Sequence, residues 1–292
     1  MGRRSFFFSK LPTTTTVTRT WSSINSCSNT RDKIAGAVGD DSGAFVVGAV
    51  GGSSVNTEEY NGTSWSGGGN NTVAKQNCQC TFGTISDAML VMGSITSSSD
   101  NNVHVEEYNG TAWSNGTNTS TGHRLNNGGG STSDGFSSGG YNSTANYDIC
   151  YEWNGSSWSV GGTLPVDWTG HAAGGSGSGD GIIMGGTYAG RSNDSATYNG
   201  TSWTNNADSI PNAHSYTSGD HGSTGSYAML FGGGLNGSAS VKTDIWNGTT
   251  WSNSDDLTNG RGAGGGSGSG GDAIAISGQS NPSATKTCEV YT

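Results

Sequence analysis

The chain has 292 residues, 30% of them hydrophobic and 12% charged, with nine tryptophans and a formal net charge of −10. The acidic balance argues against non-specific nucleic-acid binding, which needs a basic surface, and no apolar run approaches the length of a transmembrane helix. Disordered chains usually lack aromatic residues and carry high charge, so the tryptophans favour a folded all-β protein with short strands.

Residues 1–17 stand outside the repeat that fills the rest of the chain. Their apolar core is too short for a secretory signal, and Phe6 stands where a myristoylation signal needs serine or threonine. A run of threonines follows Pro12 and indicates an extended arm or linker. Two interpretations remain open: Phe6, Phe7 and Phe8 anchor the protein to a partner, or the tail lies on the domain's own surface.

The first repeat is incomplete. Trp21 lies at the repeat spacing before Trp65, but neither an aromatic strand nor an Asn-Gly turn precedes it. The missing half stands at the other end of the chain, where Glu289–Tyr291 matches the strand before the turn and the sequence then stops. We expect this C-terminal strand to pair with the strand of Trp21, which closes a ring and removes open sheet edges.

The repeating unit is an aromatic residue, Asn-Gly, two small residues and a tryptophan. It begins at Tyr60, Tyr108, Trp153, Tyr198 and Trp246. Asn-Gly predicts a type I′ hairpin turn, because both central residues of that turn need positive φ. Each unit is therefore expected to be two tightly joined antiparallel strands. A period of about 45 residues with strand signals is typical of propellers, solenoids and arrays.

Two more strands fit into each repeat. Short apolar runs such as Ala44–Gly48 and Gly181–Gly186 fit strands that are buried on both faces. Runs of small residues, such as Gly128–Ser131 and Ala172–Ser176, precede them and allow backbones to approach closely around an axis. Counting the strands predicts an all-β fold, a six-bladed β-propeller with four antiparallel strands per blade over residues 18–292.

The order of features in each repeat is an apolar strand, a Gly-Gly pair, an aromatic residue and a tryptophan. Gly51-Gly52, Tyr60 and Trp65 show the set most clearly. This pattern resembles kelch-type propeller repeats, with shorter loops and an added Asn-Gly-Thr turn. The variant is similar to Gly/Ser/Asn-rich kelch-like proteins of marine phages and bacteria. The resemblance implies the propeller fold, and it leaves the function open because propellers have many functions.

Basic residues recur where the chain enters the first strand of each repeat. Strands alternate in direction, so these loops share one face and would form a basic collar on a closed ring. The candidate ligand-binding residues are Arg31, Lys75, Arg124, His171, His214 and Arg261, with Trp168 in the same zone. One interpretation is an anionic ligand or sugar acid held near the axis. The other is that these side chains bond to loop carbonyls or are solvated.

The sequence contains no recognisable catalytic constellation, metal site or cofactor motif. Glycoside chemistry needs two carboxylates that converge from different elements, whereas Glu58-Glu59 and Glu106-Glu107 are adjacent and point to opposite faces of a strand. We expect these glutamates to lie on solvated outer strands. The five cysteines have no zinc spacing and are interpreted as packing residues or free thiols.

The expected function is non-enzymatic: a virion structural, decoration or host-attachment protein of a phage, located at the virion surface. The arm would attach to capsid or tail proteins, and the propeller would face outward. The adhesin-like polar composition, the arm and the lack of a secretion signal motivate this hypothesis. The alternative is a free extracellular lectin that binds carbohydrate, such as a host surface glycan, through the collar. A propeller enzyme is the third possibility.

Overall fold

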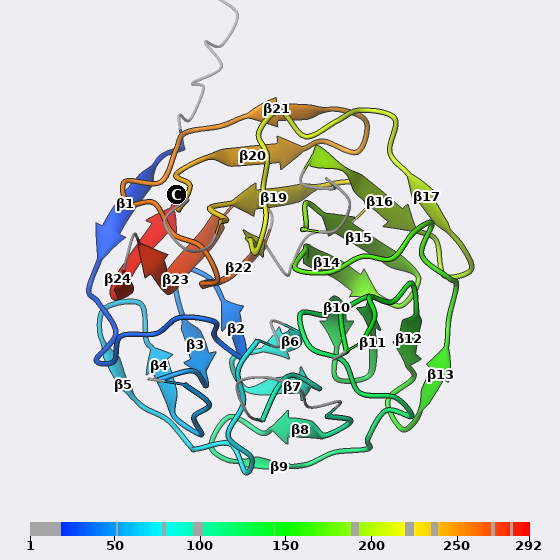
Figure 1. Ribbon diagram of the computed structural model, residues 1–292. Helices are drawn as coiled ribbons and strands as arrows, with labels where there is room; N and C mark the ends of the chain where they lie inside the picture. The colour runs from blue at the N-terminus through cyan, green and yellow to red at the C-terminus, as the bar shows by residue number, and fades with distance from the viewer. Residues whose placement is uncertain are drawn as a thin grey trace, which may run out of the picture.

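The computed structural model describes residues 19–50, 52–77, 80–95, 102–142, 144–187, 193–219, 225–234, 239–269, 272–280 and 283–292. These residues form six four-stranded antiparallel sheets, arranged as blades around one axis (Figure 1). The predicted all-β, six-bladed propeller is confirmed. The expected arm, with Phe6, Phe7 and Phe8, lies outside the described residues. Within the ranges given, no helix is long and apolar enough to cross a membrane.

Each blade runs from an inner strand at the axis to an outer strand at the rim. Blade 1 has β2 (Gly36–Gly39), β3 (Ala44–Val47), β4 (Thr57–Tyr60) and β5 (Trp65–Gly67). Blade 2 has β6 (Thr81–Thr84), β7 (Asp87–Val91), β8 (Val105–Tyr108) and β9 (Trp113–Asn115). Blade 3 has β10 (Asn127–Ser131), β11 (Asp134–Ser138), β12 (Cys150–Trp153) and β13 (Trp158–Val160).

The second half of the ring repeats this order. Blade 4 has β14 (Ala172–Gly177), β15 (Asp180–Met184), β16 (Ser195–Tyr198) and β17 (Trp203–Asn205). Blade 5 has β18 (Ser218–Gly219), β19 (Ala228–Phe231), β20 (Thr243–Trp246) and β21 (Trp251–Asn253). Blade 6 has β22 (Gly265–Ser269), β23 (Asp272–Ser280) and β24 (Ser283–Tyr291), and its outer strand is β1 (Trp21–Ile24).

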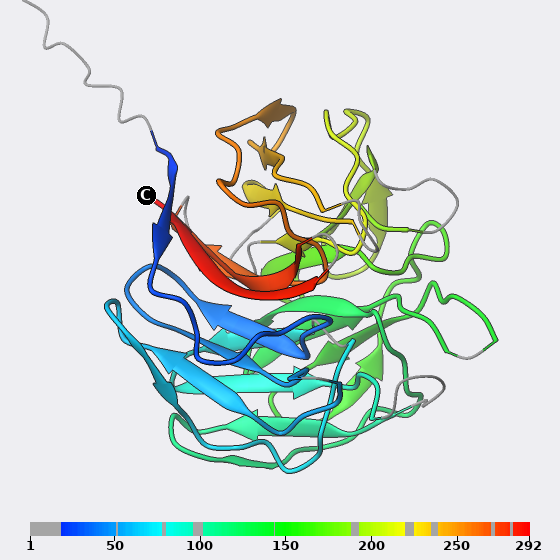
Figure 2. The same cartoon turned by 60° about the vertical axis from the view of Figure 1, so that its left-hand side comes forward.

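The two ends of the chain close the ring in blade 6. β1 pairs with β24 in antiparallel register, with Trp21 opposite Tyr291 and Ile24 opposite Cys288. Figures 1 and 2 show the blue N-terminal strand beside the red C-terminal strand at the rim. The predicted pairing of the terminal strands is therefore confirmed.

Glycines bring the inner strands together. A Cβ atom at Gly36 would lie 1.6 Å from Thr81 Oγ1 of the next blade. A Cβ at Gly129 would lie 2.4 Å from the backbone nitrogen of Gly175, one blade further round. Real Cβ atoms never approach so closely, so a larger residue at either position would push neighbouring blades apart. This confirms the interpretation of the small-residue runs as inner strands.

The Asn-Gly turns differ from the predicted type. Four residues separate the paired Tyr60 and Trp65, two more than a two-residue type I′ loop has. Gly62 has a φ of +85°, but Asn61 has no positive φ. The Asn61 Oδ1 atom instead accepts the N–H groups of residues 63 and 64 at 3.0 and 2.9 Å. The asparagine thus caps the loop with its side chain.

Tryptophans of the outer strands join adjacent blades. Trp113 Nε1 donates to Thr57 Oγ1 of blade 1 at 3.1 Å, and Trp21 Nε1 donates to Thr243 Oγ1 of blade 5 at 3.0 Å. Each ring also packs on the aromatic residue opposite it, as Trp113 does on Tyr108 with ring centroids 4.9 Å apart. The repeated aromatic pair is therefore a structural element that fills the space between blades.

Candidate functional site

One residue with a left-handed backbone precedes each inner strand and aligns the six repeats. These residues are Lys33, Asn77, Leu125, Gly170, Tyr216 and Ala263, with φ between 47° and 60°. Backbone hydrogen bonds connect successive members of this set around the axis. In the first, the Asn77 N–H donates to the Lys33 carbonyl at 2.8 Å, and in the last, the Ala263 N–H donates to the Tyr216 carbonyl at 2.8 Å. The residues two positions earlier are equivalent, and we call them the clamp residues: Arg31, Lys75, His123, Trp168, His214 and Arg261.

Four clamp residues each pair with a carboxylate from the third strand of their own blade. The pairs are Arg31–Glu58, Lys75–Glu106, His214–Asp244 and Arg261–Glu289. Arg31 Nη2 lies 2.8 Å from Glu58 Oε2, and all eight side chains are at most 2% exposed. Charges buried to this degree persist only when they are paired and hydrogen-bonded.

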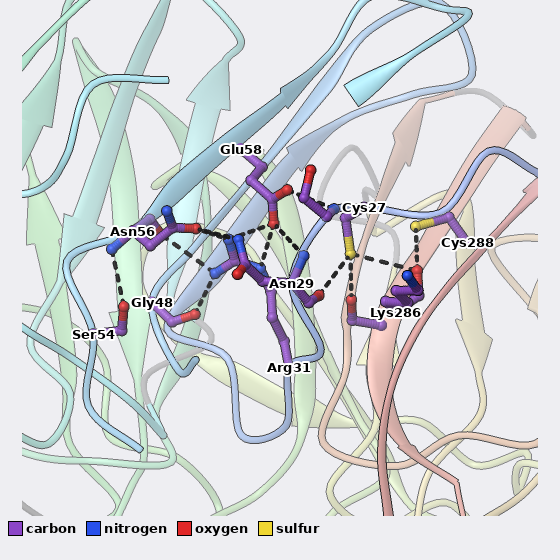
Figure 3. A network of polar contacts seen from close by, with 11 residues as sticks. Cys27, Asn29, Arg31, Gly48, Ser54, Asn56, Glu58, Lys286 and Cys288 are labelled. Atoms are coloured by element: carbon purple, nitrogen blue, oxygen red, sulfur yellow. Dashed lines mark hydrogen bonds and ion pairs between the residues drawn. The ribbon is translucent and has the colours of Figure 1, made fainter. Parts of the chain in front are cut away.

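The blade 1 pair also binds the backbone on both sides (Figure 3). Arg31 Nη1 donates to the Gly48 carbonyl, at the end of the second strand, at 2.5 Å. Glu58 accepts the N–H groups of Ser28 and Asn29, in the loop that enters the blade, at 2.6 and 3.3 Å. Equivalent bonds are His214 to Gly232, Arg261 to Ser277 and Thr258 to Glu289. Each pair therefore fixes the entry loop to its blade.

Blades 3 and 4 replace both members of the pair together. In blade 3, His123 faces Tyr151 with ring centroids 6.3 Å apart. In blade 4, Trp168 belongs to the same buried cluster as Ala196 and donates to the Gly185 carbonyl at 2.6 Å. A carboxylate stands opposite a basic residue, and a small residue stands opposite the large indole. The clamp is thus a structural device that each blade fills with its own matched pair.

Most of the predicted ligand residues lie inside the blades. Arg31, Lys75, His214 and Arg261 are at most 1% exposed, and Trp168 is fully buried. The expectation of an exposed collar is corrected for these five, because the clamp geometry directs their side chains into the blade. Their contacts with backbone carbonyls agree with the second interpretation made from the sequence.

Arg124 directly follows the clamp residue His123, and His171 directly follows the left-handed Gly170, so neither occupies a clamp position. His171 is fully buried with Nε2 3.3 Å from Ser138 Oγ, and burial lowers its pKa to about 3. Arg124 is half-buried, and its guanidinium carbon lies 5.0 Å from the centroid of the Tyr141 ring. Of the seven predicted residues, Arg124 is the one that is not buried.

The glutamate pairs also differ from the sequence interpretation. Glu58 and Glu106 are buried clamp partners, and only the second glutamate of each pair is partly exposed. Glu59 accepts a hydrogen bond from the Tyr108 hydroxyl of the next blade. The sequence did contain a signal for the clamp. An acidic residue stands two places before the repeat aromatic in the four blades whose clamp residue is Arg31, Lys75, His214 or Arg261.

Arg124 borders a pocket of about 240 Å³ on the face where the entry loops lie. Its lining also includes Tyr141, Tyr216, Thr169 and Thr187. Thr169 is 5% exposed, and its hydroxyl oxygen is buried without a hydrogen-bond partner. The pocket therefore offers a guanidinium group and two tyrosines to a small polar ligand.

A second pocket, of about 310 Å³, lies on the axis at the opposite face. Backbone of the inner-strand ends lines it, including Gly39, Gly83 and Gly130. Asp40 is its charged lining residue, and Asp40 Oδ1 already accepts the Ser42 N–H at 2.8 Å. In the part of the chain that the structure describes, no three His, Cys, Asp or Glu residues are grouped to hold a metal ion.

Comparisons with known proteins show the fold. No protein-family model matches the chain, and no curated protein matches it. A solved structure entitled "Structure of YjhT" superposes with a TM-score of 0.71 at 14% sequence identity. The match covers 90% of this chain and 95% of that one. At this identity the likeness shows that the chain shares the six-bladed propeller architecture with YjhT.

Proposed function

We propose that this protein is a non-enzymatic component of a phage virion, built from kelch-type repeats, that serves in decoration or host attachment. Residues 1–17 attach it to capsid or tail proteins, and the propeller faces outward at the virion surface. The observation that supports this most is the position of the N-terminal strand. β1 is the outermost strand of blade 6, so the chain enters the propeller at its rim (Figures 1 and 2).

An anchor attached at the rim leaves both faces of the disc free. It also leaves the fold intact, because residues from Thr20 onward close the ring. The Thr20 N–H donates to the Thr292 carbonyl at 3.1 Å. The buried ion pairs support the same proposal, because they use charged groups to hold the entry loops rigidly to the blades. A rigid, soluble, polar ring is suited to display on a particle.

In the test, particles are assembled in the presence of either the full chain or a chain that lacks residues 1–17. We expect the full chain to co-sediment with particles in a density gradient at high salt, and the truncated chain to remain in the soluble fraction. Circular dichroism of the truncated chain checks that the propeller still folds. A triple substitution of Phe6, Phe7 and Phe8 by serine separates the aromatic anchor from the length of the arm. Normal incorporation of the truncated chain would refute the proposal.

A second candidate function is carbohydrate binding, and the pocket beside Arg124 favours it. An arginine binds a carboxylate through two parallel N–H groups, and tyrosine rings pack on the apolar face of a sugar. The site differs from the collar expected from the sequence, because only Arg124 of that set is accessible. This function is compatible with host attachment and also with a free lectin.

Glycan-array binding by the isolated monomer tests this candidate. Arg124→Gln should lower binding of carboxylated sugars at least tenfold, and Arg124→Lys should also lose affinity because a lysine cannot form the two-pronged contact. Lys242→Gln is the matched control, since Lys242 is an exposed cation that pairs with Asp256 at 2.7 Å. Equal binding by the Arg124→Gln variant and the Lys242→Gln control would remove this pocket from consideration.

A further inference from the structure

Two cysteines meet where the ends of the chain close the ring. Cys27 follows β1, and Cys288 lies in β24 opposite Ile24. The Cys27 N–H donates to the Lys286 carbonyl at 3.2 Å, which extends the pairing of β1 with β24. Both thiols are 1% exposed and belong to the same buried cluster. Only the closed ring brings them together, because they lie near opposite ends of the sequence.

The two sulfur atoms are turned toward the same carbonyl group (Figure 3). Cys27 Sγ lies 3.4 Å and Cys288 Sγ lies 3.6 Å from the Lys286 oxygen. Cys27 Sγ is also 2.9 Å from the Ser277 hydroxyl oxygen. Contact with the neighbouring Cys288 thiol is the main cause that lowers the pKa of Cys27 to about 7. The same contact raises the pKa of Cys288.

We propose that Cys27 and Cys288 are an oxidisable pair, which a peroxide converts into a disulfide that closes the propeller ring covalently. The Cys27 thiolate attacks one oxygen of hydrogen peroxide, the O–O bond breaks, and Cys27 becomes a sulfenic acid with release of hydroxide. The Cys288 sulfur then attacks the Cys27 sulfur and its proton leaves with the hydroxyl group as water. In sum, two thiols and one peroxide give one disulfide and two water molecules.

The position of the pair determines what the disulfide would do. No loop joins β1 to β24, and non-covalent contacts alone hold the two strands together. Release of β1 exposes the edge of β24, so this seam is where opening of the ring is easiest. A disulfide across the seam restricts the unfolded chain over nearly its whole length. It also keeps β1 in place when the blades fluctuate.

The experiment oxidises the reduced full-length chain with equimolar hydrogen peroxide, blocks the remaining thiols and maps the peptides by mass spectrometry without reduction. We expect a peptide in which Cys27 is linked to Cys288, with the loss of two hydrogen atoms. We also expect the midpoint of thermal unfolding to rise by about 10 °C, and dithiothreitol to reverse this rise.

Matched variants assign the effect. Cys288→Ser should abolish both the linked peptide and the thermal shift, whereas Cys150→Ser should preserve them. Cys150 stands at the same register in blade 3, three residues before the repeat aromatic, but Trp203 is beside its sulfur. If a variant fails to fold, the peptide map of the unaltered chain and the reversible shift of its unfolding temperature still test the proposal. Three results would overturn the proposal: thiols that stay unlinked, a sulfinic acid at Cys27 beside a reduced Cys288, or a linked peptide without a reversible thermal shift.

Discussion

At the scale of single residues, the clamp explains why charged groups recur in a protein with few charges. A buried ion pair adds little net stability compared with an apolar pair, but loss of one partner leaves a buried charge without compensation. The two members of each pair therefore have to match one another. Blade 3 has His123 with Tyr151, and blade 4 has Trp168 with Ala196, where the other blades have an arginine, lysine or histidine paired with a carboxylate.

Glu58→Ala tests the clamp as a pair. We expect this variant to lose about 3–5 kcal/mol of unfolding free energy, because Arg31 stays buried and loses its carboxylate. The double variant Arg31→His with Glu58→Tyr copies blade 3 and should recover part of this loss. Urea denaturation of the two variants measures the difference. A double variant that is no more stable than Glu58→Ala would show that the pairs do not act as interchangeable units.

Two buried histidines predict how stability depends on pH. Burial lowers the pKa of His123 to about 4 and that of His171 to about 3, from an ordinary value of 6.5. The unfolded chain therefore binds protons first, and stability is lost as pH falls from 6.5 toward 4. Each histidine contributes a slope of roughly 1.4 kcal/mol per pH unit in this window.

His123→Phe provides the check, since phenylalanine keeps the stacking on Tyr147, whose ring centroid lies 4.2 Å from that of His123. Denaturation curves between pH 7 and 4 should show a shallower loss of stability for the variant than for the unaltered chain. Identical pH dependence would mean that His123 takes up its proton at the same pH in the folded and the unfolded chain.

At the scale of elements, the sequence predicted the blades well and the loops less well. Regular tryptophans and apolar runs fixed the number of strands, because their spacing depends only on the repeat. The direction of the clamp side chains depends on the left-handed residue two places later. That residue is lysine, asparagine, leucine or tyrosine in four blades, and no local pattern distinguishes it. Arg124 was therefore grouped with Arg261, although the two side chains point into different environments.

The Asn-Gly loops give a prediction at this scale. Asn109 Oδ1 accepts the N–H groups of residues 111 and 112 at 3.1 and 2.9 Å. Asn109→Ala removes both acceptor contacts and should cost about 1–2 kcal/mol of unfolding free energy. Asn109→Asp keeps the acceptor oxygen and should cost less. Thermal and urea unfolding compare the two, and an equal loss would show that the side chain does not cap the loop.

At the scale of the whole molecule, the ring converts six weak units into one fold. Each inner strand contacts the next blade, and outer tryptophans such as Trp113 and Trp251 bond to the blade before them. The seam between β1 and β24 completes this cycle without a chain connection. The sequence predicted this seam because the two halves of one repeat stand at opposite ends. It did not predict that Cys27 and Cys288 meet there, since Cys27 lies beyond the repeated pattern.

Trp21 and Trp113 allow the seam to be tested against an uninterrupted blade. Both indoles donate to a threonine hydroxyl of the preceding blade, Trp21 at 3.0 Å and Trp113 at 3.1 Å. Replacement of either tryptophan by alanine should lower the free energy of unfolding by about 3–5 kcal/mol. Only Trp21→Ala should also release a strand, because an Asn-Gly loop joins β9 to β8, whereas no loop joins β1 to β24. Hydrogen exchange should then increase at the amides of β24 in Trp21→Ala, while β8 stays protected in Trp113→Ala. Equal protection of the two strands would show that closure is no weaker than the rest of the ring.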